Sequence, residues 1–381
     1  MRALKFCPPS TSAESAQASR VVPFRHELDL PLGIVEGFYG PAWSWSEREF
    51  VMRQLAPAGY SFYLYAPKSD ERLRRRWRMP HRAEDIAALS RFANSCRSEN
   101  VAFGLGLSPY GVCEDFTPAA RALLTRKIDE LNAVSPDIIA ILFDDMRGDL
   151  PGLAETQAKI VELVAERSSA KRVIMCPTYY SDDTVLDRVF GQRDEDYLFD
   201  LGRLLDPKVD VFWTGEEVCS REITPGHLTR VATQLKRVPV LWDNYPVNDG
   251  PRMSPHLHLR GFTGRSADNA PLLAAHAVNP ALQPGLSLIP ALTLINAYKR
   301  GEAYEYAESW SRAARHVLGE ALAAEVRDDL LLLQDWGLDR LGDRRHLLLE
   351  RYRKHDHRCA REIVAWLNGD YAVSQETVQT Q

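Results

Sequence analysis

The sequence lacks the cysteine and glycine patterns that mark several common classes of protein. Its 381 residues include six cysteines, at positions 7, 96, 113, 176, 219 and 359, and no two of them form a C-x-x-C pair. This spacing gives no disulfide framework of a small secreted domain, so we expect free thiols in a reducing compartment. Glycine-rich phosphate loops of the P-loop or dinucleotide type are also absent from the sequence, and we expect no cofactor.

Long apolar runs and metal-ligand clusters are missing as well. No run approaches the roughly 18 apolar residues that cross a membrane, and residues 1–30 lack the apolar core of a signal peptide. His256 and His258 alternate without a third nearby ligand, which favours surface or packing histidines over a metal site. We therefore expect no metal, and a cytoplasmic protein in which residues 1–30 form a disordered leader.

The charge balance does not favour a polyanionic partner. The formal net charge is −5 and the hydrophobic content is 45%. A protein of this charge has no general electrostatic attraction to nucleic acid or to an anionic membrane, so we expect neither as a partner. The length and apolar content are enough to bury a full barrel plus a small accessory unit.

Two adjacent aspartates, Asp144 and Asp145, close the apolar run 138–143, which reads as a fully buried strand. Carboxylates at the end of such a strand lie where a parallel α/β barrel places its catalytic groups. Two neighbouring carboxylates do not both ionise cheaply, so their pKa values are pushed apart, as one acid and one base require. Taken alone, the pair is more often a helix N-cap or a solvated loop, and other strand ends must support the interpretation.

Strand-like and helix-like segments alternate along the chain. Eight β-like runs cover residues 33–39, 62–67, 101–108, 138–145, 173–180, 209–215, 238–245 and 273–279. Helical periodicity covers residues 46–56, 83–99, 118–133, 155–166 and 225–235. This alternation predicts an α/β fold in which a (β/α)8 TIM barrel is followed by a small C-terminal helical region.

Polar or aromatic residues gather where the predicted strands end. Any one of them is as well explained as a cap or turn residue, but seven of the eight strands end in this way. Because parallel strands of a barrel end at the same mouth, these side chains predict a single active site there. They are Glu36, Tyr39, Lys68, Asp70, Asp144, Asp145, Tyr179, Tyr180, Trp213, Thr214, Trp242, Asp243, Asn244, Asp249 and Asn279.

Seven motifs follow one another in a fixed order. They are Gly-Ile-Val-Glu-Gly-Phe-Tyr-Gly (33–40), Tyr-Leu-Tyr-Ala-Pro-Lys (63–68), Leu-Phe-Asp-Asp (142–145), Cys-Pro-Thr-Tyr-Tyr (176–180), Phe-Trp-Thr-Gly (212–215), Leu-Trp-Asp-Asn-Tyr-Pro-Val-Asn-Asp (241–249) and Asn279-Pro280. Over about residues 31–300 the chain resembles the catalytic domain of glycoside hydrolase family 84, the β-N-acetylglucosaminidases that include the nucleocytoplasmic O-GlcNAcases. The ordered set is specific, although no single motif is decisive.

The resemblance implies a retaining exo-β-N-acetylglucosaminidase that hydrolyses terminal β-linked GlcNAc, including O-GlcNAc on proteins. In the family, the acetamide of the substrate is the nucleophile and forms an oxazoline, an exception to the usual two-carboxylate scheme. Asp144 would orient and polarise the acetamide N–H and stay ionised. Asp145 would act as general acid and then as general base. The implied partner is a carbohydrate or glycoprotein that bears β-GlcNAc.

The resemblance also assigns substrate-binding roles. The backbone carbonyl of Gly37 and the side chain of Lys68 would bind sugar hydroxyls, and Asp249 and Asn279 would bind the 4- and 6-hydroxyls. Tyr180 (in preference to its neighbour Tyr179) would hold the acetamide oxygen. Trp242 would form an apolar wall beside the acetamide methyl group, and Asn244 would act near the acetamide and Asp145. Without the resemblance, Lys68 is equally well a solvated lysine and Trp242 equally well core filling. Trp213 and Thr214 would line or support the pocket.

Two stretches depart from the family pattern. Residues 72–78 hold five arginines, which form either a solvated helix face, the commoner case, or a binding surface for an acidic aglycone. Tyr110 occupies a position where the family pattern has a glycine, and its larger side chain would narrow the part of the pocket that receives the aglycone. Both differences leave the natural aglycone open.

The C-terminal portion is helical in pattern. We expect residues 31–300 to form the catalytic domain, residues 301–370 a region of two to four helices, and residues 371–381 a polar tail. In the family, such helices shape the substrate-binding groove of the catalytic domain or mediate a homodimer. The sequence does not distinguish these two roles. Two other functions also stay open, a hyaluronidase-like or chito-oligosaccharide endo-hydrolase and a non-catalytic GlcNAc-binding protein.

Overall fold

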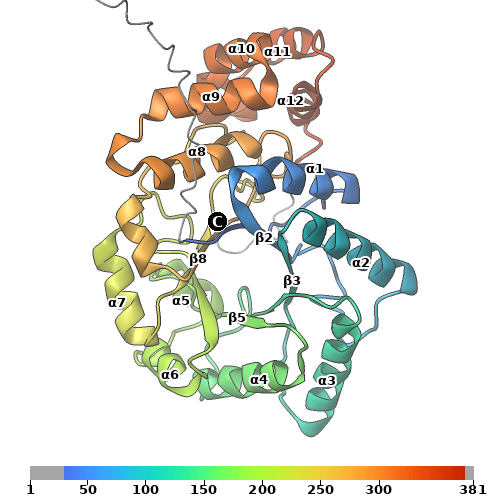
Figure 1. The fold of residues 1–381 in the computed structure, drawn as a ribbon, viewed down its shortest axis with the longest axis vertical. Coiled ribbons are helices and arrows are strands. Elements are labelled where there is room, and N and C mark those ends of the chain that lie inside the picture. The colour runs from blue at the N-terminus through green and yellow to red at the C-terminus, as the bar shows by residue number, and fades with distance from the viewer. Residues whose placement is uncertain (1–29, 374–381) are drawn as a thin grey trace, which may run out of the picture.

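The computed structural model describes residues 30–373, so the predicted leader and most of the polar tail lie outside the described residues. Eight parallel strands form a closed barrel in chain order, with β1 paired to β8 (Figure 1). The strands are β1 (Leu32–Glu36), β2 (Tyr60–Tyr65), β3 (Ala102–Leu107), β4 (Ile138–Leu142), β5 (Arg172–Cys176), β6 (Val209–Trp213), β7 (Val240–Asp243) and β8 (Ala275–Val278). The predicted TIM barrel is confirmed.

Helices form a ring around this barrel (Figure 1). The five predicted helical segments correspond, within two residues at each end, to α1 (Trp45–Leu55), α2 (Ala83–Ser98), α3 (Pro118–Asn132), α4 (Leu153–Arg167) and α7 (Pro225–Leu235). The helices that the sequence pattern did not single out are α5 (Val185–Phe190), α6 (Tyr197–Leu204), α8 (Leu288–Arg300) and the 3-10 turns η1 (Ala56–Ala58), η2 (Ala267–Leu272) and η3 (Gly301–Ala303). No helix within residues 30–373 is both long and apolar enough to cross a membrane.

The predicted β-runs extend beyond the true ends of the strands. β4 ends at Leu142 and β5 at Cys176, although apolar or aromatic residues continue after both. The chain leaves the barrel wall there, and Asp145 adopts a left-handed backbone conformation with φ of 60°. An L-residue rarely adopts this conformation unless its surroundings require it. The residues beyond the strand ends therefore form the loops of the mouth.

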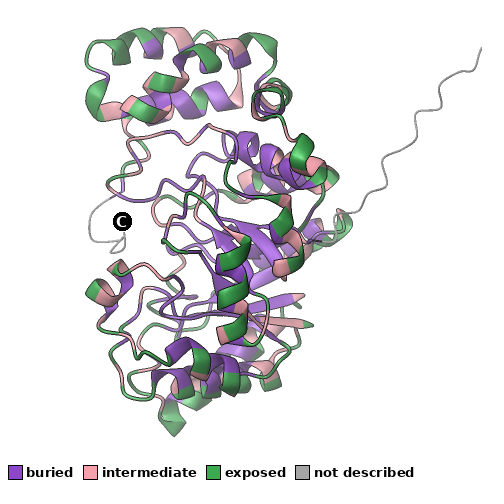
Figure 2. Ribbon diagram, turned by 90° about the vertical axis from the view of Figure 1, so that its left-hand side faces the viewer, coloured by how far each residue is buried: buried purple, intermediate pink, exposed green. Residues whose placement is uncertain are grey.

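The barrel core is continuous with the inner faces of the helices, as the buried residues in Figure 2 show. Every residue of β1 and β4 is buried. Strands of a parallel barrel have side chains packed on both faces, which explains why the sequence shows continuous apolar runs instead of alternation. This packing makes the strand ends a rigid base for the mouth.

A buried ion pair fixes the end of β1. Glu36 accepts hydrogen bonds from Nε and Nη2 of Arg48 on α1, at 2.8 and 2.7 Å, and from the Tyr63 hydroxyl on β2, at 2.7 Å. Both carboxylate oxygens are thus satisfied inside the protein, as a buried charge requires. The cluster holds the segment that continues into Gly37 and Tyr39.

A second buried ion pair fixes the end of β7. Asp243 accepts from Nε and Nη2 of Arg265 at 2.8 and 2.7 Å, and lies 3.0 Å from Nε2 of His276 on β8. Burial alone would raise the pKa of Asp243, but the charge and hydrogen bonds of Arg265, with a smaller effect of His276, lower it to about 2. The anchored carboxylate fixes the backbone from which Asn244 projects.

Four further α-helices follow the barrel, and the first of them lies beside α8 (Figure 1). They are α9 (Tyr306–Leu318), α10 (Glu320–Leu330), α11 (Arg344–Tyr352) and α12 (Arg358–Asn368), with a π-helical turn η4 (Leu331–Trp336) and a 3-10 turn η5 (Leu338–Arg340) between α10 and α11. They surround a second apolar core that also includes Leu257, Leu259, Leu286 and Ile289.

This helical region holds the long connection between β7 and β8. The indole of Trp310 donates to the Leu259 carbonyl at 2.8 Å, and that of Trp366 to the Ser254 carbonyl at 3.0 Å. The amide oxygen of Gln334 accepts from the Leu259 backbone N–H at 2.8 Å. Because the same connection carries Asp249, the helices support one side of the barrel mouth.

Candidate active site

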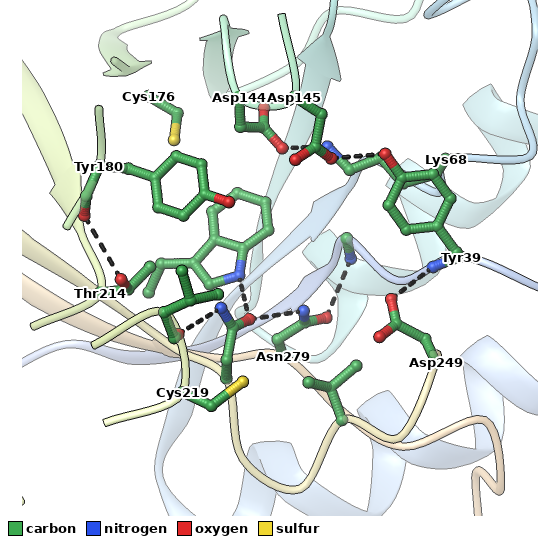
Figure 3. A pocket seen from close by; sticks show the side chains of 15 residues that line it. Tyr39, Lys68, Asp144, Asp145, Cys176, Tyr180, Thr214, Cys219, Asp249 and Asn279 are labelled. Carbon is green, nitrogen blue, oxygen red and sulfur yellow. Dashed lines mark hydrogen bonds and ion pairs between the residues drawn. The ribbon is translucent and has the colours of Figure 1, made fainter. Parts of the chain in front are cut away.

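All nine site residues predicted from the sequence line one pocket at the C-terminal mouth of the barrel (Figure 3). Trp242 lies within β7 and the others lie in the loops that follow six of the eight strands, which explains why they are far apart in sequence. The lining residues are Gly37, Tyr39, Lys68, Asp144, Asp145, Cys176, Tyr180, Thr214, Val218, Cys219, Trp242, Asn244, Val247, Asp249 and Asn279.

Asp144 pairs with Lys68 across the pocket. The Lys68 ammonium, at the end of the β2 loop, contacts Oδ2 of Asp144 directly, and both side chains are buried. The other oxygen, Oδ1, is buried and has no hydrogen-bond partner among the described residues. Burying a carboxylate oxygen without a hydrogen-bond donor costs free energy. Asp144 is therefore prepared to accept a hydrogen bond from a ligand.

Asp145 lies in a different environment although it is the next residue. Its Oδ2 accepts from the Tyr39 hydroxyl at 2.5 Å, and Nη2 of Arg74 donates to that hydroxyl at 3.0 Å. Removal from water is the main effect that raises the pKa of Asp145; the charge of Asp144 adds to it, while Lys68, Tyr39 and Arg74 oppose it. The net raised pKa suits a carboxyl group that donates a proton near neutral pH.

A chain of amides forms the opposite wall of the pocket. Oδ1 of Asn244 accepts from the Trp242 indole at 3.0 Å and from Nδ2 of Asn279 at 2.9 Å. Oδ1 of Asn279 in turn accepts from the Gly37 backbone N–H at 3.3 Å. These bonds assign the amide orientations and hold the Trp242 ring, which is 5% exposed and faces the pocket.

Gly37 is a position where the fold requires the absence of a side chain. A Cβ placed on it would lie 2.2 Å from Cζ2 of Trp242. The backbone at Gly37 thus packs directly against the indole ring of Trp242. Asp249 closes this side, since its Oδ2 accepts from the Tyr39 backbone N–H at 2.7 Å.

The structure separates residues that the sequence left as alternatives. Tyr180 lines the pocket, whereas the Tyr179 hydroxyl donates to the Gly191 carbonyl at 2.6 Å and lies outside it. Thr214 lines the pocket and its backbone N–H donates to the Tyr180 carbonyl at 2.9 Å. Trp213 is fully buried and does not line the pocket, because its indole points at Nε2 of His227, 2.9 Å away.

Sequence reasoning did not assign a role to several residues of the site. Tyr39 is one of the predicted strand-end residues and Arg74 belongs to the arginine run, but nothing in the sequence indicates that the Tyr39 hydroxyl bonds to Asp145 and that Arg74 bonds to this hydroxyl. Cys176 lies within the motif 176–180 without an assigned role, and the lining residues Val218 and Cys219 carried no recognisable signal. Burial raises the pKa of the Cys176 thiol well above its usual value, so this side chain acts as a small apolar wall.

Within residues 30–373, no three His, Cys, Asp or Glu side chains are arranged to hold a metal ion. His256 Nδ1 lies 2.7 Å from the Gln334 carbonyl, and the His258 ring stacks on Tyr245 with ring centroids 5.6 Å apart. Both histidines are packing residues of the β7–β8 connection.

Comparison with known proteins gives a consistent result. The sequence model of the beta-N-acetylglucosaminidase family matches residues 32–334. The Protein O-GlcNAcases of Mus musculus and Rattus norvegicus are each 31% identical over 258 residues, which is 65% of this chain and 28% of theirs. This chain therefore spans little more than a quarter of the length of those relatives. A mutant of the Thermobaculum terrenum O-GlcNAc hydrolase matches with a TM-score of 0.73 and 29% identity, covering 91% of this chain and 81% of that one.

The contact between Gly37 and Trp242 generates a stability prediction. Gly37→Ala should lower the free energy of unfolding by about 1–3 kcal/mol, because the added methyl group displaces the indole ring. Urea denaturation followed by tryptophan fluorescence measures this change. Gly226→Ala on α7, where a Cβ meets no atom within 4 Å, is the matched control and should be neutral or slightly stabilising. Equal unfolding midpoints for the two variants would contradict the proposed packing.

Proposed function

We propose that this chain, which belongs to the beta-N-acetylglucosaminidase family, is a retaining exo-hydrolase of terminal β-linked GlcNAc. The observation that carries the proposal is the pair Asp144 and Asp145 in one pocket. One carboxylate is paired with a lysine and has a buried oxygen left for a ligand, and the other has a raised pKa. Two carboxyl groups with different protonation are the requirement of substrate-assisted hydrolysis.

In the first step, the acetamide carbonyl oxygen attacks the anomeric carbon and the glycosidic C–O bond breaks. Asp144 Oδ1 accepts the acetamide N–H and stabilises the positive charge that develops on the forming oxazoline. Tyr180 holds the acetamide oxygen, and Trp242 walls its methyl group. The absence of a donor to Oδ1 among residues 30–373 supports this role for Asp144.

Asp145 donates its proton to the departing glycosidic oxygen in the same step. It then takes a proton from the water that attacks the anomeric carbon and opens the oxazoline, so that the β-configuration is retained. The raised pKa of Asp145 supports the acid role. The Tyr39 hydroxyl stabilises the carboxylate that forms when the proton leaves.

The remaining pocket residues bind the sugar ring. Gly37 offers its backbone carbonyl, and Asn244, Asp249 and Asn279 bind hydroxyl groups and the acetamide. Lys68 is assigned two roles, binding of sugar hydroxyls and compensation of the charge of Asp144. The contacts among these residues hold their polar groups in place before a substrate arrives, which lowers the cost of ordering the site.

The natural substrate is proposed to be GlcNAc attached to a protein or a small glycan. Residues 31–300 would act as the catalytic domain and residues 301–370 as its helical support.

The five described cysteines, Cys96, Cys113, Cys176, Cys219 and Cys359, are free, which supports a reducing, cytoplasmic location. A homodimer through the C-terminal helices remains a prediction, as does the lack of a nucleic-acid or membrane partner.

The first experiment compares two chromogenic substrates. The chain should release 4-nitrophenol from the N-acetyl-β-glucosaminide and not from the β-glucoside, because only the former carries the nucleophilic acetamide. Release is followed by absorbance with purified protein that is folded by circular dichroism. Equal hydrolysis of both compounds would contradict acetamide participation. Turnover of neither would instead favour an endo-hydrolase or a GlcNAc-binding protein.

The roles of the two aspartates are separated by leaving-group dependence. Asp145→Asn should reduce kcat/KM by about a hundredfold or more for alkyl glycosides, whose poor leaving groups need an acid, and far less for aryl glycosides. Asp144→Asn should slow both, since it acts on the nucleophile. Asp328→Asn, on the exposed surface of α10, is the matched control. An equal loss on both substrates in Asp145→Asn would refute its assignment as the acid.

The hydrogen bond from Tyr39 sets part of the acidity of Asp145. Tyr39→Phe removes a donor to the carboxylate, so the pKa of Asp145 should rise and the basic limb of the pH profile of kcat/KM should move up by about one pH unit. The profile is measured with an alkyl glycoside. Tyr65→Phe, whose hydroxyl bonds to Asp70 outside the pocket at 3.1 Å, should leave the limb where it is. A limb that does not move in Tyr39→Phe would reject the coupling.

A further inference from the structure

Asp145 defines the side of the pocket on which the leaving group lies. This follows from the proposed function, because the general acid must reach the glycosidic oxygen. Residues that lead from Asp145 to the protein surface therefore lie next to the aglycone. They begin with Tyr39, whose hydroxyl bonds to Asp145 at 2.5 Å, and continue with Arg74, which bonds to that hydroxyl at 3.0 Å.

Aromatic and guanidinium groups continue this line. The guanidinium carbon of Arg74 lies 5.4 Å from the centroids of both the Tyr39 and the Tyr110 rings. The guanidinium carbon of Arg75 lies 5.5 Å from the Tyr110 ring. Arg74 is 5% exposed, whereas Tyr110 is 38% exposed and Arg75 is on the surface. Tyr39, Arg74, Tyr110 and Arg75 thus form a continuous row of side-chain contacts that leads from the carboxyl group of Asp145 to the exposed Tyr110 and Arg75, and we call this row the aglycone wall.

The two guanidinium groups of the aglycone wall, Arg74 and Arg75, are not paired with acidic side chains in salt bridges among the described residues. Arg76 pairs with Glu71 at 3.3 Å, and Arg72 donates to the Pro80 carbonyl. By contrast, neither Arg74 nor Arg75 forms a salt bridge with any residue between 30 and 373. Nε of Arg74 is also buried without a hydrogen-bond partner in that range. A largely buried guanidinium with an unmet donor favours an anionic group nearby.

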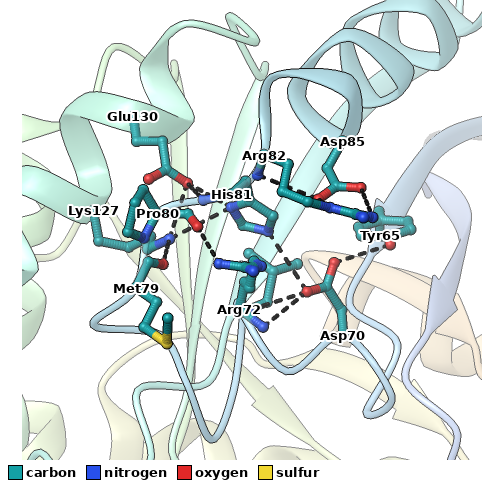
Figure 4. Close-up of polar contacts among 11 residues, drawn as sticks. Tyr65, Asp70, Arg72, Met79, Pro80, His81, Arg82, Asp85, Lys127 and Glu130 are labelled. Carbon is teal, nitrogen blue, oxygen red and sulfur yellow. Dashed lines mark hydrogen bonds and ion pairs between the residues drawn. The ribbon is translucent and has the colours of Figure 1, made fainter.

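Hydrogen bonds hold both ends of the arginine-rich segment, residues 72–78, against the rest of the protein. Residues 71–78 form successive turns, which corrects the expected solvated helix face. The segment is anchored on α3, where Lys127 Nζ donates to the Met79 carbonyl at 2.7 Å and Glu130 lies 2.5 Å from Nδ1 of His81 (Figure 4). At its other end, Oδ1 of Asp70 accepts from the Arg72 backbone N–H at 3.0 Å. A fixed segment loses little conformational entropy when a ligand binds.

We infer that the aglycone wall selects leaving groups that carry a carboxylate close to the glycosidic oxygen. The anion would lie over Tyr110, between the guanidinium groups of Arg74 and Arg75. Two sources supply this chemistry, an acidic side chain beside a glycosylated serine or threonine and a uronic acid to which GlcNAc is linked.

The test compares two aryl N-acetyl-β-glucosaminides, one with a meta-carboxylate on the phenol and one with a meta-carboxamide. The wild type should hydrolyse the carboxylate with about fivefold higher kcat/KM, the effect of one exposed ion pair. Arg75→Gln should remove this preference. Arg203→Gln, which removes an equal charge from the exposed surface of α6, should keep it. High salt should weaken the preference in the wild type.

A second pair of substrates distinguishes the two sources of the anion. Glycopeptides with Glu or Gln beside the GlcNAc-serine test the peptide source, and GlcNAc linked to glucuronic acid or to glucose tests the sugar source. A preference for the acidic member in either pair that Arg75→Gln abolishes supports the inference and identifies the source.

The outcomes separate this inference from the proposed function. Hydrolysis of the neutral and acidic aryl glycosides at equal rates would overturn the role of the aglycone wall while leaving the hydrolase intact. That role would also be overturned if Arg203→Gln lowered the preference as much as Arg75→Gln, since net charge would then be the cause. Hydrolysis of neither compound by folded protein would overturn the proposed function and this inference together.

Discussion

The pairing of Lys68 with Asp144 is the interaction on which the site depends. Two consecutive carboxyl groups at the end of a buried strand would repel each other in a place that water reaches poorly. The ammonium from the β2 loop compensates one of them, and the left-handed backbone at Asp145 turns the other toward Tyr39. Adjacent residues thereby obtain different surroundings and different chemistry. The barrel makes this arrangement available because it brings the ends of β2 and β4 to one mouth.

The rest of the molecule keeps this arrangement rigid. Buried ion pairs at Glu36 and Asp243 fix the ends of β1 and β7, directly before Gly37 and Asn244. Asp249 lies on the β7–β8 connection. The C-terminal helices hold this connection by hydrogen bonds from the indoles of Trp310 and Trp366. Supporting contacts of this kind determine the precision of a catalytic site. The helical region is thus part of the site's framework, whatever its state of association.

The two sides of the pocket are built in different ways. The side of the pocket that is proposed to bind the sugar consists of residues at or after strand ends, joined by amide hydrogen bonds and packed on the Trp242 ring. In the aglycone wall, Arg74 and Arg75 come from the turns after Lys68, which Lys127 and Glu130 anchor on α3, whereas Tyr39 follows β1 and Tyr110 follows β3. Substitutions in those turns change the surface beside the leaving group without moving the strand ends.

The order of strands, helices and polar strand ends along the chain was enough to predict the barrel, because hydrophobic periodicity is a local property. The same order, with the family's motifs, located nine of the residues that line the pocket. Contacts between distant side chains were not readable from the sequence. Nothing local to Tyr39 or Arg74 shows that Tyr39 bonds to Asp145 and that Arg74 bonds to Tyr39. The repeated arginines favoured a helix where the chain forms turns. Likewise, residue type alone does not distinguish Tyr179 from Tyr180. The resemblance to the family favoured Tyr180, and the direction of the backbone after β5 places this residue at the pocket. Such contacts arise when the barrel closes, since closure alone sets the distances between residues that follow different strands.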